Sequence, residues 1–338
     1  MNTYVGLDVS LKNTSVCVVD QDGSIVAMKS VASDPEAIAT YVQDKAPMIH
    51  RVGLESGPTS IWLWRELAKR DLPVVCIDAR HAKAGLSMQI NKSDRNDAAG
   101  IARIMQTGWY REVQIKSPRS DATRALLSSR ALLIKIKRDL ENQIRGLLKC
   151  TGLVIGRATG IAFTEKAKSL MGSDPALVEF VQPLLDVRDS VHDQLVMLDR
   201  RVGRLAQSQP QTRAFMTVPG VGPITALSCM AAIDDPTRFK RARNVGAYLG
   251  LTPRRYASGE VDWQGRISKC GDAMTRTYLF EAAGVLLTRV KKWCALKAWG
   301  LRIAKRSGMK KARIAVARKL AVILLRMWRD ETEFQWST

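Results

Sequence analysis

The sequence predicts an α/β domain at the N-terminus, followed by two mainly helical regions. Three observations support this: residues 1–110 alternate β-rich apolar runs with helical segments, residues 121–149 and 175–205 repeat apolar residues at helical spacing, and residues 210–338 are basic and largely helical in pattern. With 338 residues, 46% of them hydrophobic and 25% charged, the chain is long enough for two or three globular domains.

The N-terminal region begins with three predicted strands, over residues 4–9, 15–19 and 25–31, with turn residues between them. A helix over 35–45, a strand over 51–55, a helix over 61–70, a strand over 74–77 and a helix over 94–105 follow. The order βββαβαβα is that of a ribonuclease H-like fold. We therefore expect the first strand to be central and the fourth to lie beside it.

Four acidic residues occupy related places in this order. Asp8 and Glu55 each end an apolar run, and Asp94 and Asp97 are three residues apart, so that they share one helix face. The expected fold brings all three places to one edge of the sheet. Gathered carboxylates repel each other, and their hard oxygen atoms suit Mg²⁺. The four acids therefore predict a divalent-metal site and metal-assisted phosphodiester chemistry.

Each acid taken alone also has a purely structural interpretation. Asp8 could cap a turn, Asp97 could be favoured by the helix dipole, and Asp94 could lie in the preceding loop as the helix N-cap. Asp20, Asp22 and Asp78 are interpreted as turn acids. It is the set of four at the places the fold demands that favours the metal site.

The charge balance predicts a polyanionic partner. The formal net charge is +21 and the isoelectric point is near 10.0. Residues 1–110 are neutral, with 12 basic and 12 acidic residues, whereas residues 211–338 hold 24 basic and 9 acidic residues. The acidic site and the basic surface therefore lie in different parts of the chain.

Membrane insertion and secretion are not indicated by the sequence. It contains no run of about 18 apolar residues and no signal peptide. The six cysteines form no CxxC pair and lack a nearby histidine set, so we expect reduced thiols in a cytoplasmic protein.

The two helical stretches predict an antiparallel hairpin or coiled-coil arm, with apolar stripes that could pair with a second subunit or pack within one chain. Residues 152–172 form a weakly patterned link, and the tract 207–211 resembles a boundary. The predicted domains are therefore 1–110, 111–209 and 210–338.

The C-terminal region opens with a candidate helix-hairpin-helix, in which Val218–Pro223 precedes an apolar run over 224–233. Its glycines could let backbone amides approach a phosphate, or could serve a tight turn between packed helices. Further on, residues 305–319 carry seven basic residues, partly on an amphipathic helix, which is typical of contact with a nucleic-acid backbone.

Ser258 lies next to Gly259 in a segment expected to be a flexible turn. Four basic residues surround it in the sequence, namely Arg254, Arg255, Arg266 and Lys269. Fixed positive charge around a hydroxyl would bind a phosphate and stabilise the charge that develops when an oxygen attacks it.

The ordered set of Asp8, Glu55, Asp94 and Asp97, VPGVGPITA, YLGLTPRRYASG and GRISKCG resembles the DEDD transposases of a family of bacterial insertion sequences, whose members are bridge-RNA-guided recombinases. The resemblance covers nearly the whole chain. It implies a ribonuclease H-like domain of the Holliday-junction-resolvase kind, a helical coiled-coil region, and a C-terminal transposase domain with a nucleophilic serine. Ser258 matches that serine, and Ser268 is the second candidate.

The resemblance also implies a mechanism and partners. Metal held by the four acids, Mg²⁺ or Mn²⁺, would assist a covalent phosphoserine intermediate, so that a DNA strand is cut and rejoined without ATP. Expected partners are donor DNA, target DNA, an element-encoded bridge RNA and further copies of the chain, as a dimer assembling to a tetramer in the bacterial cytoplasm on the nucleoid. The expected nucleic-acid contacts are Arg254, Arg255, Arg266, Lys269, Lys305, Arg306, Lys310 and Lys311.

Two other functions compete with this one. A metal-dependent, structure-selective nuclease, such as a junction resolvase, would use the acids and water without Ser258. A nucleic-acid-binding protein without catalysis would make the acids accidental.

Overall fold

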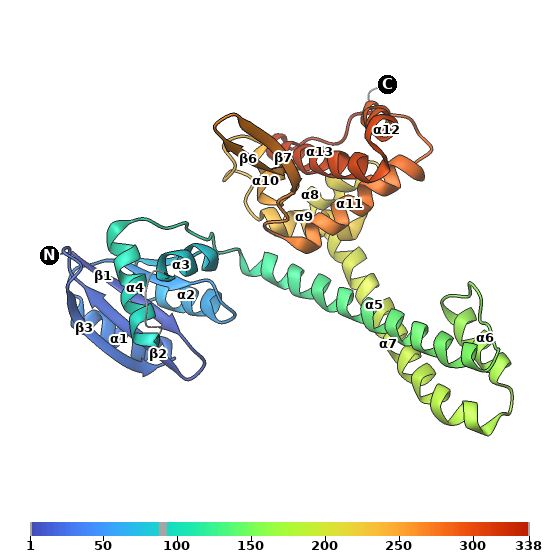
Figure 1. Ribbon diagram of the computed structural model, residues 1–338, viewed down its shortest axis with the longest axis horizontal. Helices are drawn as coiled ribbons and strands as arrows, with labels where there is room; N and C mark the ends of the chain where they lie inside the picture. Colours follow the sequence, from blue (N-terminus) through green and yellow to red (C-terminus); the bar gives the residue numbers. More distant parts are fainter. Residues whose placement is uncertain (1, 88–92, 337–338) are drawn as a thin grey trace. The chain divides into compact units, whose positions relative to one another are not determined.

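The computed structural model describes residues 2–87 and 93–336, and the chain divides into two compact units, residues 1–115 and 116–338 (Figure 1). The first unit contains the region predicted as a first domain, residues 1–110, and that domain assignment stays a prediction. The second unit contains both the helical region and the C-terminal region, and the predicted subdivision near residue 209 stays a prediction.

A five-stranded mixed sheet forms the centre of the first unit. Its strands are β1 (Thr3–Val9), β2 (Asn13–Val19), β3 (Ile25–Ala32), β4 (Ile49–Glu55) and β5 (Val74–Ile77). Their order is β3-β2-β1-β4-β5, with β1–β2 and β2–β3 antiparallel and β1–β4 and β4–β5 parallel. The central place of β1, with β4 beside it, is the arrangement predicted for a ribonuclease H-like fold.

Helices cover both faces of this sheet. Successive residues of a strand point to opposite faces, and both sets are apolar here, so each face needs a covering layer. Val16 and Val18 of β2 pack in one core with α1 (Pro35–Lys45) and α2 (Ser60–Ala68). Cys17 and Val19 pack on the other face against α4 (Asp94–Thr107). A short helix α3 (Ala79–Leu86), which we did not predict, begins after Asp78, whose side chain accepts hydrogen bonds from the amides of Arg80 and His81.

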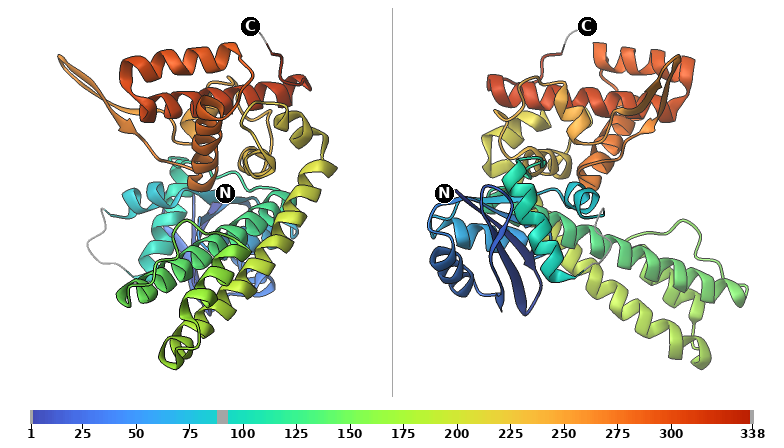
Figure 2. Two further views of the ribbon diagram at one scale, coloured as in Figure 1. Left: turned by 90° about the vertical axis from the view of Figure 1, so that its right-hand side faces the viewer. Right: turned by 60° about the vertical axis from the view of Figure 1, so that its left-hand side comes forward.

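Two long helices form an antiparallel arm in the second unit, α5 (Pro118–Cys150) and α7 (Pro175–Ser208) (Figure 2). Polar pairs join Arg130 to Asp199, Lys137 to His192 and Glu141 to Arg188, so numbers that rise along α5 fall along α7. The predicted hairpin is therefore present within one chain. The link between these helices contains an additional helix, α6 (Ile161–Met171), which the weak pattern of 152–172 did not predict.

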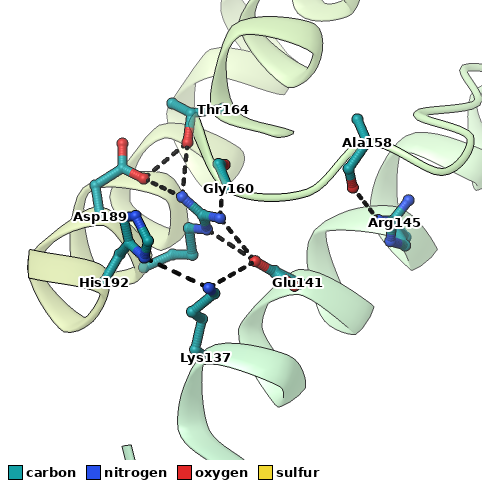
Figure 3. Close-up of polar contacts among 9 residues, drawn as sticks. Lys137, Glu141, Arg145, Ala158, Gly160, Thr164, Asp189 and His192 are labelled. Atoms are coloured by element: carbon teal, nitrogen blue, oxygen red, sulfur yellow. Dashed lines mark hydrogen bonds and ion pairs between the residues drawn. The ribbon is translucent and has the colours of Figure 1, made fainter. Parts of the chain in front are cut away.

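Arg188 ties the three helices of this arm together. Its guanidinium, 1% exposed, donates to Glu141 Oε1 of α5 at 2.8 Å, to Asp189 Oδ1 at 2.8 Å and to the Gly160 carbonyl at 2.8 Å (Figure 3). Burial alone would raise the pKa of Asp189, but hydrogen bonds from Arg188 and Thr164 and the charge of Arg188 outweigh it and lower that pKa. A buried charge satisfied on all sides fixes the helix register here.

The remaining helices of the second unit share one large core. They are α8 (Pro210–Met216), α9 (Pro223–Ile233), α10 (Asn244–Tyr248), α11 (Ala273–Thr288), α12 (Ala295–Ser307) and α13 (Met309–Asp330). Residues of α9, α11 and α13, including Leu227, Leu286 and Leu320, are completely buried in it. A two-stranded ribbon of β6 (Pro253–Ser258) and β7 (Val261–Ile267) joins α10 to α11.

All six cysteines are free thiols, as expected from their spacing. Within the described part of the chain, every helix is too short or too polar to cross a membrane.

Candidate active site

The pairing of β1 with β4 brings Asp8 and Glu55 to the same edge of the sheet. The two strands are parallel, and Leu7 lies in register with Leu54, so the next residue of each strand is one of the two acids. The backbone of Asp8 is also paired with Ser15 of β2, and the carbonyl of Glu55 accepts a hydrogen bond from the Ser60 hydroxyl at 2.6 Å. Both acids therefore sit on firmly held backbone.

Both acids also share the face of the sheet that α4 covers. A Cβ atom added to Gly6 would lie 2.1 Å from the carbonyl oxygen of Ala98, and one added to Gly53 would lie 2.5 Å from Met105, so both glycines face α4. Asp8 and Glu55 follow these glycines by two residues, and in a strand such residues point to the same side.

Helix α4 runs across this face from the acidic edge inward. Its later residue Met105 lies at Gly53, and the carbonyl of Met105 accepts a hydrogen bond from Arg51, near the start of β4, at 3.1 Å. The first turn therefore lies toward the strand ends. Asp94 and Asp97 come four residues before Ala98 and Ile101, both buried against the sheet, and so extend the sheet-facing stripe of α4 to that edge.

Ser93, and not Asp94, is the N-cap of α4. Its hydroxyl accepts a hydrogen bond from the amide of Asn96 at 3.3 Å, and Asp94 is the first helical residue. Asp94 is exposed, whereas Asp8, Glu55 and Asp97 are half-buried. The alternative that Asp94 serves as the cap is thus excluded. Asp20 and Asp78 do hold turns through backbone amides, as we predicted.

The donor chemistry of the four acids suits a hard divalent cation, since each offers carboxylate oxygen atoms. Across residues 2–87 and 93–336, however, no three His, Cys, Asp or Glu side chains lie close enough together to form a ready metal site. The backbone gathers the carboxylates at one edge, and metal binding would require their side chains to converge further.

Ser258 lies in the second unit, at the tip of the ribbon. It is the last residue of β6, is exposed, and pairs with Val261 across a two-residue turn. The turn is Gly259-Glu260, and the positive φ of 56° at Gly259 fits the hairpin turns that need glycine at their first position. The predicted turn is therefore present at Gly259-Glu260, and Ser258 is the strand residue directly before it; the two strands that it joins were not predicted.

The four basic residues that flank Ser258 in the sequence lie toward the base of the ribbon, away from Ser258 at its tip, and differ in their contacts. Arg255 forms a two-point ion pair with Asp262, at 2.7 and 2.8 Å, which lowers the pKa of that carboxyl. Arg254 donates to the Ser268 carbonyl at 3.4 Å, while Arg266 and Lys269 are exposed. An exposed ion pair contributes little stability, so Arg255 can exchange Asp262 for a phosphate at small cost.

Ser268 is held more tightly than Ser258. Its amide donates to the carbonyl of Thr252 at 2.9 Å, and its hydroxyl accepts from the amide of Cys270 at 3.4 Å. It is half-buried at the base of the ribbon. The geometry makes Ser258 the more accessible of the two hydroxyls.

Two aromatic residues beside Ser258 escaped the sequence analysis. Tyr256 and Trp263 pair across the ribbon, with ring centroids 4.3 Å apart and ring planes within 18°. The signal was present as alternation, with Tyr two residues before Ser258 and Trp two residues after Val261.

The segment for which we predict a helix-hairpin-helix contains α8, a turn over residues 217–222, and α9, and the motif itself stays a prediction. Gly220 has φ +86°, and a Cβ there would lie 2.5 Å from the Ala282 carbonyl, so this glycine serves close packing against α11. A Cβ at Gly222, in contrast, would meet none of the described atoms within 4 Å. The amides at the start of α9 therefore remain the part of the turn suited to a phosphate.

The second basic group lies where α12 meets α13. Lys305, Arg306, Lys310 and Lys311 are all exposed on either side of Gly308, while Ala312 and Val316 of α13 face the core. The charged residues and the packed residues thus occupy different faces of the amphipathic helix, as predicted.

Known transposases resemble this chain along most of its length. A DEDD transposase family model matches residues 5–152, and a model described as "Transposase IS116/IS110/IS902 family" matches residues 212–298. The chain is 31% identical to the transposase for insertion sequence element IS1111A of Coxiella burnetii, over 95% of this chain and 88% of that protein. It is 26% identical to a probable family 20 transposase of Pseudomonas aeruginosa, over 97% of each.

A pilin gene-inverting protein of Moraxella bovis is 29% identical to this chain over 148 residues, which are 42% of this chain and 45% of that protein. The first family model spans the four acids, and the second spans Ser258.

Proposed function

The chain belongs to the IS116/IS110/IS902 family of transposases, and we propose that it cuts and rejoins DNA through a covalent bond at Ser258, with divalent metal held by Asp8, Glu55, Asp94 and Asp97 and with target choice by a bridge RNA. DNA transposition is the activity of the family. The covalent serine, the metal ligands and the RNA are our proposal for this chain.

The metal site is supported by the backbone positions of the four acids, all toward one edge of the sheet. The strands β1 and β4 end at this edge, and helix α4, which is far from β1 in the sequence, begins there. Each of the three carries a carboxylate on the face of the sheet that α4 covers. Mg²⁺ or Mn²⁺ bound there would supply positive charge that polarises a scissile phosphate. Asp94, the most exposed of the four acids, would complete the ligand set from the helix start.

The exposure of Ser258, at the tip of a ribbon that also carries basic residues, supports it as the nucleophile. Its Oγ would attack the scissile phosphorus, lose its proton to a base and form a phosphoester bond, while the departing DNA oxygen leaves as a hydroxyl. A hydroxyl of another strand would then attack the same phosphorus, restore the serine and join the new DNA. Arg254, Arg255, Arg266 and Lys269 would bind phosphates of the DNA along the ribbon, since they lie three or more residues from Ser258 toward its base.

The proposed RNA guide and oligomer rest on the motif resemblance and on the charge. Base pairing would carry the sequence information, so the protein would need contacts mainly to backbone and shape. The +15 charge of residues 211–338, including Lys305, Arg306, Lys310 and Lys311, suits that task. A dimer assembling to a tetramer on DNA, in the bacterial cytoplasm, completes the proposal.

The second candidate function is a structure-selective nuclease. One observation favours it: the four acids lie within one compact unit, so metal and water could cleave DNA there without the other unit.

Denaturing electrophoresis distinguishes the two functions. Purified protein is mixed with labelled donor and target DNA, the element's RNA and Mg²⁺, and a covalent protein–DNA adduct is sought. We expect an adduct with the wild type and with Ser268→Ala, and none with Ser258→Ala or Asp8→Asn. Asp22→Asn, an exposed acid of the same unit, serves as the control for Asp8→Asn. Cleavage without an adduct that persists in Ser258→Ala would establish the nuclease instead.

A further inference from the structure

The ribbon that carries Ser258 exposes an unusual amount of aromatic surface. Tyr256 and Trp263, stacked on each other, are 46% and 53% exposed, and Val261 beside them is 58% exposed. The two strands pair with no other strand in the described part of the chain, and the ribbon extends away from the helices of its own unit (Figure 2). The pair therefore lies outside the core of this unit.

The aromatic pair and Ser258 lie on the same face of the ribbon. Tyr256 precedes Ser258 by two residues on β6, and their partners across the ribbon are Trp263 and Val261. Residues two apart in a strand point to one side, about 7 Å from each other. Arg255 and Asp262, which form the ion pair, belong to the opposite face.

We propose that Tyr256 and Trp263 form a stacking platform for an unpaired base of the DNA strand that is cut at Ser258. This proposal rests on the proposed role of Ser258. The spacing along β6 matches a base on a nucleotide adjoining the phosphate that Ser258 attacks. Stacking that base would fix the phosphate at the hydroxyl, so the two aromatic residues act in positioning.

The chemistry of the surroundings selects this occupant. Exposed aromatic faces bind bases by stacking, the net charge of +15 in residues 211–338 attracts the phosphates between those bases, and such binding tolerates any base sequence. A base inside a duplex already has both faces covered by its neighbours. The platform is therefore specific for a strand that has been separated, which is the state that strand exchange requires.

Stabilisation of the ribbon is the competing explanation for the pair, since cross-strand aromatic pairs strengthen hairpins. Replacing both aromatic rings by valine distinguishes ribbon stabilisation from base stacking. Valine is a good strand former with a branched side chain, so Tyr256→Val with Trp263→Val keeps the ribbon's β-propensity and removes only the ring faces.

Binding to two matched probes tests the proposal in the full-length protein. The first is a fluorescent single-stranded DNA of 12 nucleotides, and the second is a 12-unit abasic phosphodiester backbone of the same charge, both followed by anisotropy. We expect the wild type to bind the DNA probe more tightly than the abasic backbone. The double valine variant should lose roughly 5- to 150-fold in affinity for the DNA probe and keep its affinity for the abasic backbone. Trp293→Val removes an equally exposed tryptophan of the same unit as the control.

Equal loss on both probes, or no loss on DNA, would overturn the platform. Loss on a 12-nucleotide RNA but not on DNA would overturn the assignment of the base to DNA. Repeating the titrations in a Ser258→Ala background separates this inference from the proposed function, because binding does not need the nucleophile. Circular dichroism of the double variant checks that it is folded.

A second readout locates the base. Single abasic sites are placed in turn along the strand that forms the adduct. We expect one site next to the cut to lower adduct formation in the wild type, and the double valine variant to be insensitive to that site. Equal sensitivity in both proteins would contradict the platform.

Discussion

Lys116 is a cation that the protein keeps partly out of water at the start of α5. Its ammonium donates to the Ala231 carbonyl at 3.1 Å. Burial, and then the nearby charge of Arg124, lower its pKa from 10.5 to about 8. The folded state therefore releases this proton at lower pH than the unfolded state does.

The pH dependence of stability should show this shift. Below pH 8 both states hold the proton, and the penalty for the buried charge is complete. Between pH 8 and 10.5 the unfolded state binds more protons, so the contribution of Lys116 to the free energy of unfolding rises with pH, by on the order of 3 kcal/mol at most. The free energy of unfolding of Lys116→Met minus that of the wild type should fall across this range.

Urea unfolding at pH 7.5, 9 and 10, followed by circular dichroism, measures the difference. Lys149→Met, at the exposed end of the same helix, is the control. A difference for Lys116→Met that stays constant with pH would contradict the shift.

At the scale of the elements, the contact of α4 with β1 sets the acidic edge. Gly6 lets the helix backbone lie directly on the strand, since a Cβ there would be 2.1 Å from the Ala98 carbonyl and 2.4 Å from the Ala102 amide. Backbone atoms cannot rotate away as a side chain can. The position of Asp94 and Asp97 therefore depends on a residue that carries no functional group.

Gly6→Ala should displace α4 and uncouple its two acids from Asp8 and Glu55. We expect a loss of about 1–3 kcal/mol in the free energy of unfolding, together with loss of metal-dependent activity. Gly146→Ala is the matched control, because a Cβ there meets none of the described atoms within 4 Å, and it should stabilise α5 by about 0.5–1 kcal/mol. Denaturant unfolding and the adduct assay report both effects, and full activity in Gly6→Ala would show that α4 tolerates the displacement.

At the scale of the whole molecule, charge is distributed unequally along the chain. Residues 1–110 are neutral and residues 211–338 carry +15, so DNA affinity should depend mainly on the C-terminal part. Each phosphate neutralised releases counter-ions, and affinity must fall as salt rises.

Lys310→Gln with Lys311→Gln should weaken DNA binding and make it less sensitive to salt. If each lysine binds one phosphate, the slope of log affinity against log salt concentration should shrink by about 2. Anisotropy titrations between 50 and 200 mM salt give the slope. Lys45→Gln with Lys69→Gln, two exposed lysines of the first unit, should leave it unchanged, and an equal change there would show that the effect is one of net charge.

The sequence by itself determined the strands of the first unit, their order and the acids that end them. Buried strands and amphipathic helices leave apolar periodicities of their own, and the observed bounds of β1, β4, β5 and α4 follow the predicted runs closely. The same reasoning located both helices of the arm, because their stripes repeat over about thirty residues.

Short or weakly patterned elements were missed because their local signal is small. α3 has only eight residues, and α6 lies in a segment where glycines interrupt the pattern. The β6–β7 ribbon is exposed on nearly all its residues, and the alternation of Tyr256, Val261 and Trp263 is too short to mark it as two strands.

Only the tertiary structure decided which side chains lie together on one face or at one edge. It fixed the direction of α4 across the sheet, made Ser93 the cap in place of Asp94, and put Ser258 on the same face as Tyr256 and Trp263. Such placements depend on register between strands and on contacts between residues far apart in the chain. Periodicity identifies an element and its buried side, but the packing of one backbone against another determines which residues meet.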